Sequence, residues 1–556
     1  MANLMPTTKS VSELVDLFES GSIVVPEIQR DVVWKADKVK ALVDSISKEF
    51  PCGSLILWEP REKDRSIVRS LVRPERLENN QGDLPKYFLL DGQQRLTALS
   101  SVLLKRELLK DLLVEIEDDM PYIYTNLKKF PNEMEATDTQ SGYNFPWVLF
   151  NKLFDGTLSD DPGYSKLDNE KKETIRKYVQ KFRDYQFPIQ IISGQKYETV
   201  AEIFTRVNSL GTQLTGAEIY LAKIVPHWTG ITREFREYRK EVKKNNYDLD
   251  LTFLIKAITA IECKVPQIKK LAEKIHKDQL SKAHLNKTWK KVKNSTNKII
   301  NVLQKQLCLD KSKYITSKNA LVPLVYYIVT EQKGIAIRNI KKFFIFSQLS
   351  EHYGSAADTT LRKDFKILTE ALPRHGLSEL VENVIYESRQ KYRGLKIKSE
   401  EFERLPSRSV LLLLMYMLMR KNNATDWGGD PRLALNEIEP KDTQLHHIFP
   451  FNLMLNDKHV FKHAFKGYED RGYSLADYRE DVNSMANLTF LSQIKNGSIG
   501  DVAPSQYLLN ETTPEIRKAH FIPEDPKLWK TENFMDFLDA RSYLMAEAMT
   551  RFIKRL

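Results

Sequence analysis

The sequence has little cysteine. Only Cys52, Cys263 and Cys308 occur among 556 residues, they lie far apart, and no two form a CxxC pair. This scarcity argues against a disulfide framework and against a structural zinc site. The first residues also lack a charged segment followed by an apolar one, so no secretory signal is expected. The sequence therefore predicts a protein of the reducing cytoplasm.

Long hydrophobic segments are missing as well. The longest apolar run, Val410–Met419, is ten residues long, whereas a helix that crosses a bilayer needs about 20 apolar residues. We therefore expect a buried helix at this position and no association with a membrane.

Basic residues outnumber acidic ones, and the net charge is +11. Hydrophobic residues make up 42% and charged residues 29% of the chain, as in ordinary globular proteins. A basic excess favours a polyanionic partner, either nucleic acid or an anionic surface, although it also serves solubility. The length exceeds what one compact core accommodates and predicts two to four domains.

The apolar periodicity changes along the chain. It predicts helices over residues 11–18, 38–50, 96–109 and 199–207, and strands over residues 53–58, 87–90 and 187–192. This mixture indicates an α/β first domain. From residue 251 to 419 the pattern is helical throughout, and residues 422–441 are typical of a linker or loop.

The most informative stretch is Leu445-His446-His447-Ile448-Phe449-Pro450, which is followed by Asn487-Leu488-Thr489-Phe490-Leu491 and then by Asn496. A His-His pair alone is usually incidental. Here four polar residues stand in register with two apolar strands, as in the ββα-metal arrangement of a one-metal HNH nuclease.

Each of these side chains suits one task in phosphodiester hydrolysis. Neutral His447 can accept a proton from water near pH 7. His446 and Asn496 are the expected metal ligands, and Asn487 is expected to fix the loop between the strands or to orient the base. Two protein ligands leave room for water and phosphate oxygens, which suits Mg²⁺ or Mn²⁺.

A second constellation, Asp91-Gly92-Gln93-Gln94-Arg95, stands where a predicted strand meets a predicted helix. Backbone N–H groups at a helix start favour anions, and Gly92 permits a close approach of the chain to a ligand. Arg95 could pair with phosphate, Asp91 could bind a metal ion or activate water, and the two amides could bind a base or sugar. The alternative is a capped helix start, with Asp91 as the cap and Arg95 as a surface charge.

Two further segments add polar groups. Gln29 and Arg30 follow Pro26 in an otherwise apolar neighbourhood, and Arg206 and Asn208 precede a glycine turn. Together with Asp91–Arg95, these segments resemble the ParB/sulfiredoxin-like nucleotidase domain of GmrSD-type modification-dependent (type IV) restriction endonucleases.

The resemblance covers about residues 8–225, and residues 425–510 resemble the HNH domain of the same family. It implies an α+β multidomain fold. A mixed α/β ParB/sulfiredoxin-like domain would span residues 1–235, a helical middle region residues 236–424, and a ββα-metal HNH domain with C-terminal helices residues 425–556.

The resemblance also implies the function: nucleoside triphosphate hydrolysis coupled to cleavage of modified phage DNA in anti-phage defence. Asp91, Gly92, Gln93, Gln94 and Arg95 would form the nucleotide-handling loop, with Asp91 in catalysis. Gln29 and Arg30 would line the same pocket, with Arg206 and Asn208 nearby. The sequence departs from many relatives in having Ile28 where they have tyrosine, so its ligand could differ.

Two other functions remain open at this stage. The chain could be a non-catalytic sensor of modified DNA, although the complete set of four nuclease residues favours catalysis. It could also be a toxin-like nuclease outside restriction. The sequence does not identify the DNA modification, the nucleotide or the direction of coupling. A double-strand break would require two copies of the site, so a homo-oligomer is one open arrangement.

Overall fold

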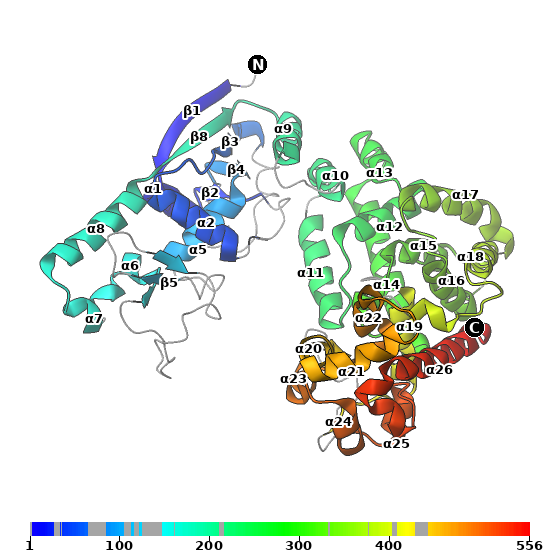
Figure 1. The fold of residues 1–556 in the computed structure, drawn as a ribbon. Coiled ribbons are helices and arrows are strands. Elements are labelled where there is room, and N and C mark those ends of the chain that lie inside the picture. The colour runs from blue at the N-terminus through cyan, green and yellow to red at the C-terminus, as the bar shows by residue number, and fades with distance from the viewer. Residues whose placement is uncertain are drawn as a thin grey trace. The chain divides into compact units, whose positions relative to one another are not determined.

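The chain forms two compact units, Met1–Arg233 and Glu234–Leu556. The computed structural model describes residues 3–26, 34, 36–64, 85–104, 113–115, 122–124, 147–160, 162–210, 216–228, 230–331, 334–375, 377–402, 409–428 and 443–556. The fold mixes helices with small sheets and is mostly helical (Figure 1). The predicted α+β class is therefore confirmed.

The first unit is built on a five-stranded mixed sheet with strand order β1-β8-β3-β4-β2. Its strands are β1 (Asn3–Ser10), β2 (Ile23–Val24), β3 (Leu55–Glu59), β4 (Tyr87–Asp91) and β8 (Gln186–Ser193), and a separate three-stranded sheet contains β5 (Leu113–Glu115), β6 (Tyr122–Tyr124) and β7 (Trp147–Leu149). Strand β3 pairs parallel to β8 and antiparallel to β4, and β4 pairs parallel to β2.

The first unit also contains helices. They are α1 (Val11–Glu19), α2 (Ala36–Ser47), α5 (Gln93–Leu103), α6 (Lys152–Asp155), α7 (Pro162–Ser165), α8 (Asn169–Asp184), α9 (Tyr197–Leu210) and α10 (Gly216–Ile224), and α11 (Ile231–Lys244) spans the boundary between the units. The helix expected over residues 11–18 is confirmed, and it begins with a capping box between Ser10 and Glu13.

Alternation along β3 gives the sheet two buried faces. Leu55 and Leu57 belong to the hydrophobic core that also contains residues of α1, α2 and α5. Trp58 packs against Phe88 of β4 and Tyr197 of α9, with ring centroids 5.5 and 6.0 Å apart. Since neighbouring side chains of a strand point to opposite faces, both faces of β3 are covered.

Strand β1 did not emerge from the sequence pattern. It contains Pro6, and its Leu4 and Met5 side chains are exposed. The strand lies at one edge of the sheet, beside β8 (Figure 1). Proline is tolerated at an edge because no further strand needs its missing N–H. The polar, proline-containing sequence of β1 therefore gave no strand signal, because the strand is formed through its pairing with β8.

In its described residues, the second unit is helical except for one two-stranded sheet. Its elements are α12 (Leu251–Cys263), α13 (Ile268–His276), α14 (Lys282–Leu307), α15 (Leu321–Thr330), α16 (Ile337–Leu349), α17 (Ala357–His375), α18 (Ser378–Lys391), α19 (Val410–Lys421), β9 (Thr443–His447), α20 (Phe451–Asn456), α21 (Lys458–Glu469), α22 (Leu475–Val482), β10 (Leu488–Ser492), α23 (Gln493–Ile499), α24 (Pro504–Glu511), α25 (Pro514–Ala519) and α26 (Phe534–Lys554). The helical prediction for residues 251–419 is confirmed.

The sheet of the second unit packs directly on the helices that precede it. The ring of Phe490 in β10 lies 5.1 Å from Tyr314 and 5.3 Å from Tyr416 of α19. Lys311 is fully buried and donates to the Thr443 hydroxyl of β9 at 2.7 Å. The helices and the sheet therefore share one core.

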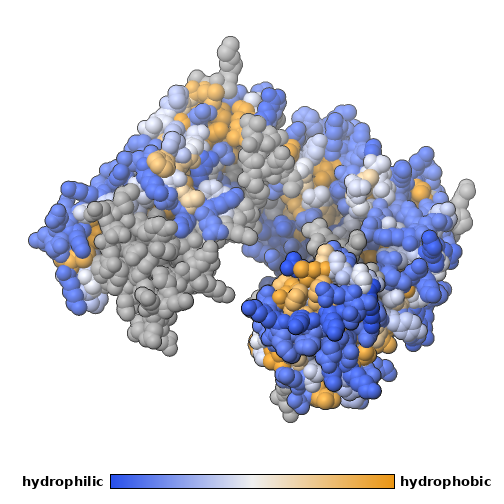
Figure 2. All heavy atoms as spheres, in the orientation of Figure 1, coloured by the Kyte–Doolittle hydropathy of each residue, from blue (hydrophilic) through white to orange (hydrophobic). Residues whose placement is uncertain are grey.

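Helix α19 is buried at every position from Val410 to Met419, as its sequence predicts. Among the described residues, no helix is both long and apolar enough to cross a membrane. The face drawn in Figure 2 is mostly hydrophilic, and its hydrophobic residues are confined to limited patches.

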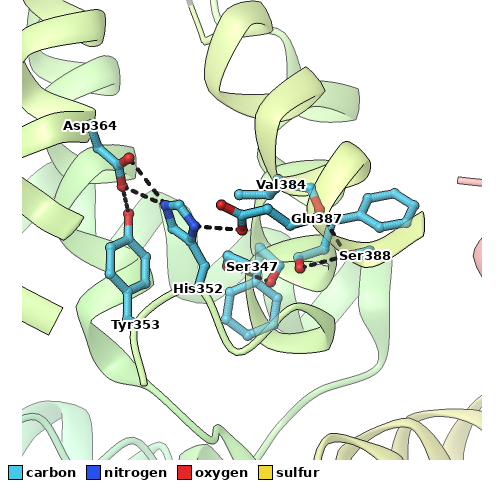
Figure 3. Close-up of polar contacts among 9 residues, drawn as sticks. Ser347, His352, Tyr353, Asp364, Val384, Glu387 and Ser388 are labelled. Carbon is cyan, nitrogen blue, oxygen red and sulfur yellow. Dashed lines mark hydrogen bonds and ion pairs between the residues drawn. The ribbon is translucent and has the colours of Figure 1, made fainter. Parts of the chain in front are cut away.

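A buried histidine joins three helices of the second unit (Figure 3). His352 follows α16, and its Nε2 lies 2.9 Å from the Asp364 carboxylate of α17, while its Nδ1 lies 2.7 Å from Glu387 of α18. Asp364 also accepts a hydrogen bond from the hydroxyl of Tyr353. Burial alone would lower the pKa of His352, but the two carboxylates outweigh burial and raise it.

Candidate functional site

The two strands of the second unit place the paired histidines beside a short helix. Strands β9 and β10 are antiparallel, with His447 opposite Leu488 and His446 opposite Thr489. Helix α23 begins directly after β10, and Ser492 caps it by accepting a hydrogen bond from Lys495 N. Two strands and a helix therefore surround the residues that the sequence singled out.

His446 and Asn496 meet across this arrangement. His446 Nδ1 lies 2.7 Å from Asn496 Oδ1, and the Asn496 amide donates to Gln444 Oε1 at 2.8 Å. The histidine is 2% exposed, and burial lowers its pKa to about 4. Gln444 was not predicted. Its position two residues before His446 puts it on the same face of β9, which is the signal that could have identified it.

The two side chains are joined by a hydrogen bond. Since the carboxamide oxygen only accepts, His446 Nδ1 carries the proton, and Nε2 keeps the lone pair that a cation would need. His446 Nε2 is buried and has no hydrogen-bond partner within the described part of the chain. In that same part, no group of three or more His, Cys, Asp and Glu residues could hold a metal ion. A cation at this pair would therefore need water or substrate oxygens as further ligands.

His447 follows His446 and is the last residue of β9. Its Nε2 lies 3.2 Å from the Oδ1 atom of Asn483. Since a carbonyl oxygen only accepts, Nε2 carries the proton, and Nδ1 keeps its lone pair. Burial lowers the pKa of His447 and favours this neutral form. Asn483 was not predicted, although it lies only four residues before Asn487.

Asn487 is fully buried and bonded at both ends of its amide. Its Oδ1 accepts from Phe449 N at 2.8 Å, and its Nδ2 donates to the carbonyl oxygens of Phe449 and Val482, both at 2.9 Å. These contacts hold the chain after β9 against the chain before β10. Asn487 therefore has the contacts expected of a residue that fixes the loop between the strands. The residue that contacts the His447 ring is Asn483.

Two residues distant in sequence support the site. Arg541 of α26 is fully buried and donates to the Ala486 carbonyl at 2.6 Å and to the His520 carbonyl at 3.1 Å. Asp426 accepts hydrogen bonds from the backbone and the hydroxyl of Ser492. Neither residue belongs to a local motif, so no sequence signal indicated these contacts.

The Asp91–Arg95 loop lies at the junction of β4 and α5. Gly92 is the N-cap with φ of 92°, and α5 begins at Gln93, earlier than predicted. Asp91 does not cap the helix. Its carboxylate lies 3.1 Å from an Arg95 Nη2 atom, and Arg95 Nη1 donates to the Cys52 carbonyl at 2.9 Å. Arg95 is therefore directed toward groups of its own chain.

The other predicted nucleotide residues are described only in part. Gln94 Oε1 accepts from Trp34 N at 3.1 Å, which joins this loop to the chain that follows Gln29 and Arg30. Gln29 and Arg30 themselves lie outside the described residues. Arg206 is exposed on α9 and pairs with Glu202 at 2.6 Å.

Two of the predicted nucleotide residues remain. Asn208 lies on the same helix as Arg206, and its side chain is outside the described part. Gln93 occupies the first turn of α5 and is half-buried.

Comparison with known proteins supports the family to which the residues pointed. Residues 11–225 match the family model of the GmrSD restriction endonuclease N-terminal domain. The chain is also 22% identical over 612 residues to an uncharacterized protein of Methanocaldococcus jannaschii, covering 98% of this chain and 99% of that protein. Residues 11–225 are therefore similar to the N-terminal domain of a restriction endonuclease family.

Proposed function

We propose that the chain is a DNA endonuclease of modification-dependent restriction, acting in anti-phage defence, with an HNH cleavage centre in the second unit. The observation that carries this proposal is the 2.7 Å approach of His446 Nδ1 and Asn496 Oδ1, with His447 adjacent on β9. The match of residues 11–225 to a restriction endonuclease family supports the choice of DNA as substrate.

His447 is the general base in this proposal. Its Nδ1 lone pair takes a proton from water as the water oxygen attacks the phosphorus atom, while Asn483 holds Nε2 and thereby the orientation of the ring. The bond from phosphorus to the leaving sugar oxygen breaks in the same step, and that oxygen takes a proton from solvent water. Asn487 acts as a positioning residue, because its three hydrogen bonds fix the loop that follows the base.

His446 and Asn496 would hold a divalent cation, Mg²⁺ or Mn²⁺. When bound, such a cation supplies electrostatic stabilisation of the phosphate oxygens as negative charge develops on them. The lowered pKa of His446 keeps the imidazole neutral, which a ligand nitrogen requires. Gln444 holds the Asn496 amide so that its oxygen faces the histidine.

The N-terminal unit is proposed to bind and hydrolyse a nucleoside triphosphate and to regulate cleavage. Asp91 and the helix start at Gln93 would face the nucleotide. The Arg95 contacts with Asp91 and Cys52 make positioning of Asp91 the role that this arginine suits best.

Cleavage of plasmid and of modified phage DNA, with Mg²⁺ or Mn²⁺ and with or without each triphosphate, tests the proposal. We expect His447→Ala to lower cleavage by about 100-fold or more, the scale of general-base catalysis. His459→Ala is the matched control, because His459 is an exposed histidine of α21 in the same unit. Equal cleavage by wild type and His447→Ala would rule out this base.

A second pair of variants tests the N-terminal role. Asp91→Asn is expected to reduce triphosphate hydrolysis, whereas His447→Ala is expected to leave hydrolysis intact. If Asp91→Asn hydrolyses every triphosphate at the normal rate, the nucleotide role does not belong to this loop. Cleavage that is independent of DNA modification would remove the modification-dependent part of the proposal.

A further inference from the structure

A polar cavity of about 980 Å³ lies in the helical part of the second unit, apart from the residues of the cleavage centre. The end of α11, the start of α12, the segment from Ser312 to Asn319 and the start of α17 form its walls. The size falls within the range of about 300–1,000 Å³ that is typical of small-ligand sites.

Lysines dominate the charge of this cavity. Lys243, Lys313 and Lys318 line it, and none of the three has a carboxylate partner among the residues described. Lys256 is buried beneath them and pairs with Asp358 at 2.6 Å. Three unneutralised ammonium groups around one cavity attract an anion.

The two carboxylates of the cavity only partly offset this charge. Asp250 is engaged at the start of α12, where its side chain accepts from Phe253 N at 2.7 Å. Asp248 is therefore the remaining carboxylate of the lining, and three lysines without ion pairs stand beside it. The first turns of α12 and α17 both contribute lining residues, and helix starts add partial positive charge.

The walls are held from behind by buried polar groups. Gln348 is fully buried, and its Oε1 accepts from Ser317 N at 2.9 Å and from the Thr316 hydroxyl. Tyr353, another lining residue, is tied to Asp364 within the cluster around His352 (Figure 3). Fixed walls reduce the ordering cost of binding.

We propose that this cavity binds the phosphate group of a small, nucleotide-sized ligand. The site is separate from the nucleotide loop of the first unit, because all its lining residues belong to the second unit. The lining segment that begins at Ser312 is also connected to the strands of the proposed cleavage centre. Lys311, the residue before it, donates a hydrogen bond to the Thr443 hydroxyl of β9.

Calorimetric titration of the full-length protein with inorganic phosphate, AMP and ATP tests this proposal. We expect Lys313→Glu, and separately Lys243→Glu, to weaken binding of at least one of these probes by about tenfold or more. Both lysines are exposed, so neither change disturbs the core. Lys366→Glu is the matched control, because Lys366 is an exposed lysine of α17 outside the cavity.

The remaining outcomes decide against the proposal. Probe binding that is unchanged in both cavity variants but lost in Asp91→Asn would assign all nucleotide binding to the first unit. If only affinity for a short DNA duplex falls, the lysines belong to a DNA surface instead. Because the experiment measures binding, its result tests the cavity even if the protein proves not to cleave DNA.

Discussion

Buried side chains with several hydrogen bonds determine the geometry of the candidate cleavage centre. Asn487 satisfies three backbone groups on both sides of the hairpin, and Arg541 donates to three carbonyl groups near it, those of Met485, Ala486 and His520. Buried polar groups that lose their partners are costly. The energetic role of these two residues is therefore distinct from that of His447, which is only half-buried.

Replacing Asn487 and replacing His447 should affect the stability of the protein differently, because Asn487 fixes the loop and His447 is the proposed base. Asn487→Ala leaves Phe449 N, Phe449 O and Val482 O without their partner, and we expect a loss of about 3 kcal/mol in the free energy of unfolding. His447→Ala should change this free energy by no more than about 0.5 kcal/mol. Urea denaturation of both variants measures the difference, and equal stabilities would exclude this role of Asn487.

His352 makes stability depend on pH. Its pKa is raised in the folded protein, so its stabilisation is fully present below the unfolded value of about 6.5 and is lost as pH rises through the folded value. His446 and His520 have lowered pKa values and act in the opposite sense, below pH 6.5.

The difference between the wild type and a His352 variant above pH 6.5 therefore isolates this histidine. We expect the wild type to lose stability between pH 6.5 and 9, and His352→Gln to show a weaker dependence. At pH 6 the variant should be less stable by about 3 kcal/mol, since it leaves the buried Asp364 without its charged partner. Urea unfolding at each pH provides the measurement, and parallel curves for the two proteins would contradict the assignment.

At the level of helices and strands, the junction between β4 and α5 is set by close packing. Gly92 has φ of 92°, and a Cβ at this position would lie 2.1 Å from Leu55 Cδ2. The absent side chain lets α5 begin directly against β3. Periodicity predicted β3, β4 and α5, but this contact between separate elements was not readable from the sequence.

Gly92→Ala should destabilise the first unit by about 1–3 kcal/mol, through overpacking and through the positive φ. Gly194→Ala separates these two causes, because Gly194 also has positive φ but has nothing within 4 Å of the added carbon. Thermal unfolding should therefore show the larger loss for Gly92→Ala. Equal losses would mean that Leu55 moves aside without cost.

At the scale of the whole molecule, the sequence predicted the fold class and the helical stretch, but not which parts share a core. The partition at residue 425 followed a family resemblance and a loop-like composition. The contacts of Phe490 with Tyr314 and Tyr416 join residues far apart along the chain. Such pairings leave no periodicity and no spacing signal in the sequence.

These contacts predict how the second unit can be divided. A fragment of residues 234–556 should unfold in one cooperative transition, because it retains the shared core. A fragment of residues 425–556 exposes Phe490 and loses the Lys311 contact with Thr443, so it should aggregate or remain unfolded. Circular dichroism during heating compares the two, and a cooperative transition in the shorter fragment would show that it is an independent domain.

The contact of Arg541 with the Ala486 carbonyl has a consequence for synthesis in the cell. A ribosome that has just translated Asn496 has made all four residues of the candidate cleavage centre but not yet α26, so the turn that precedes Asn487 still lacks its anchor. The candidate centre would therefore be completed only after the last helix of the second unit has been synthesised.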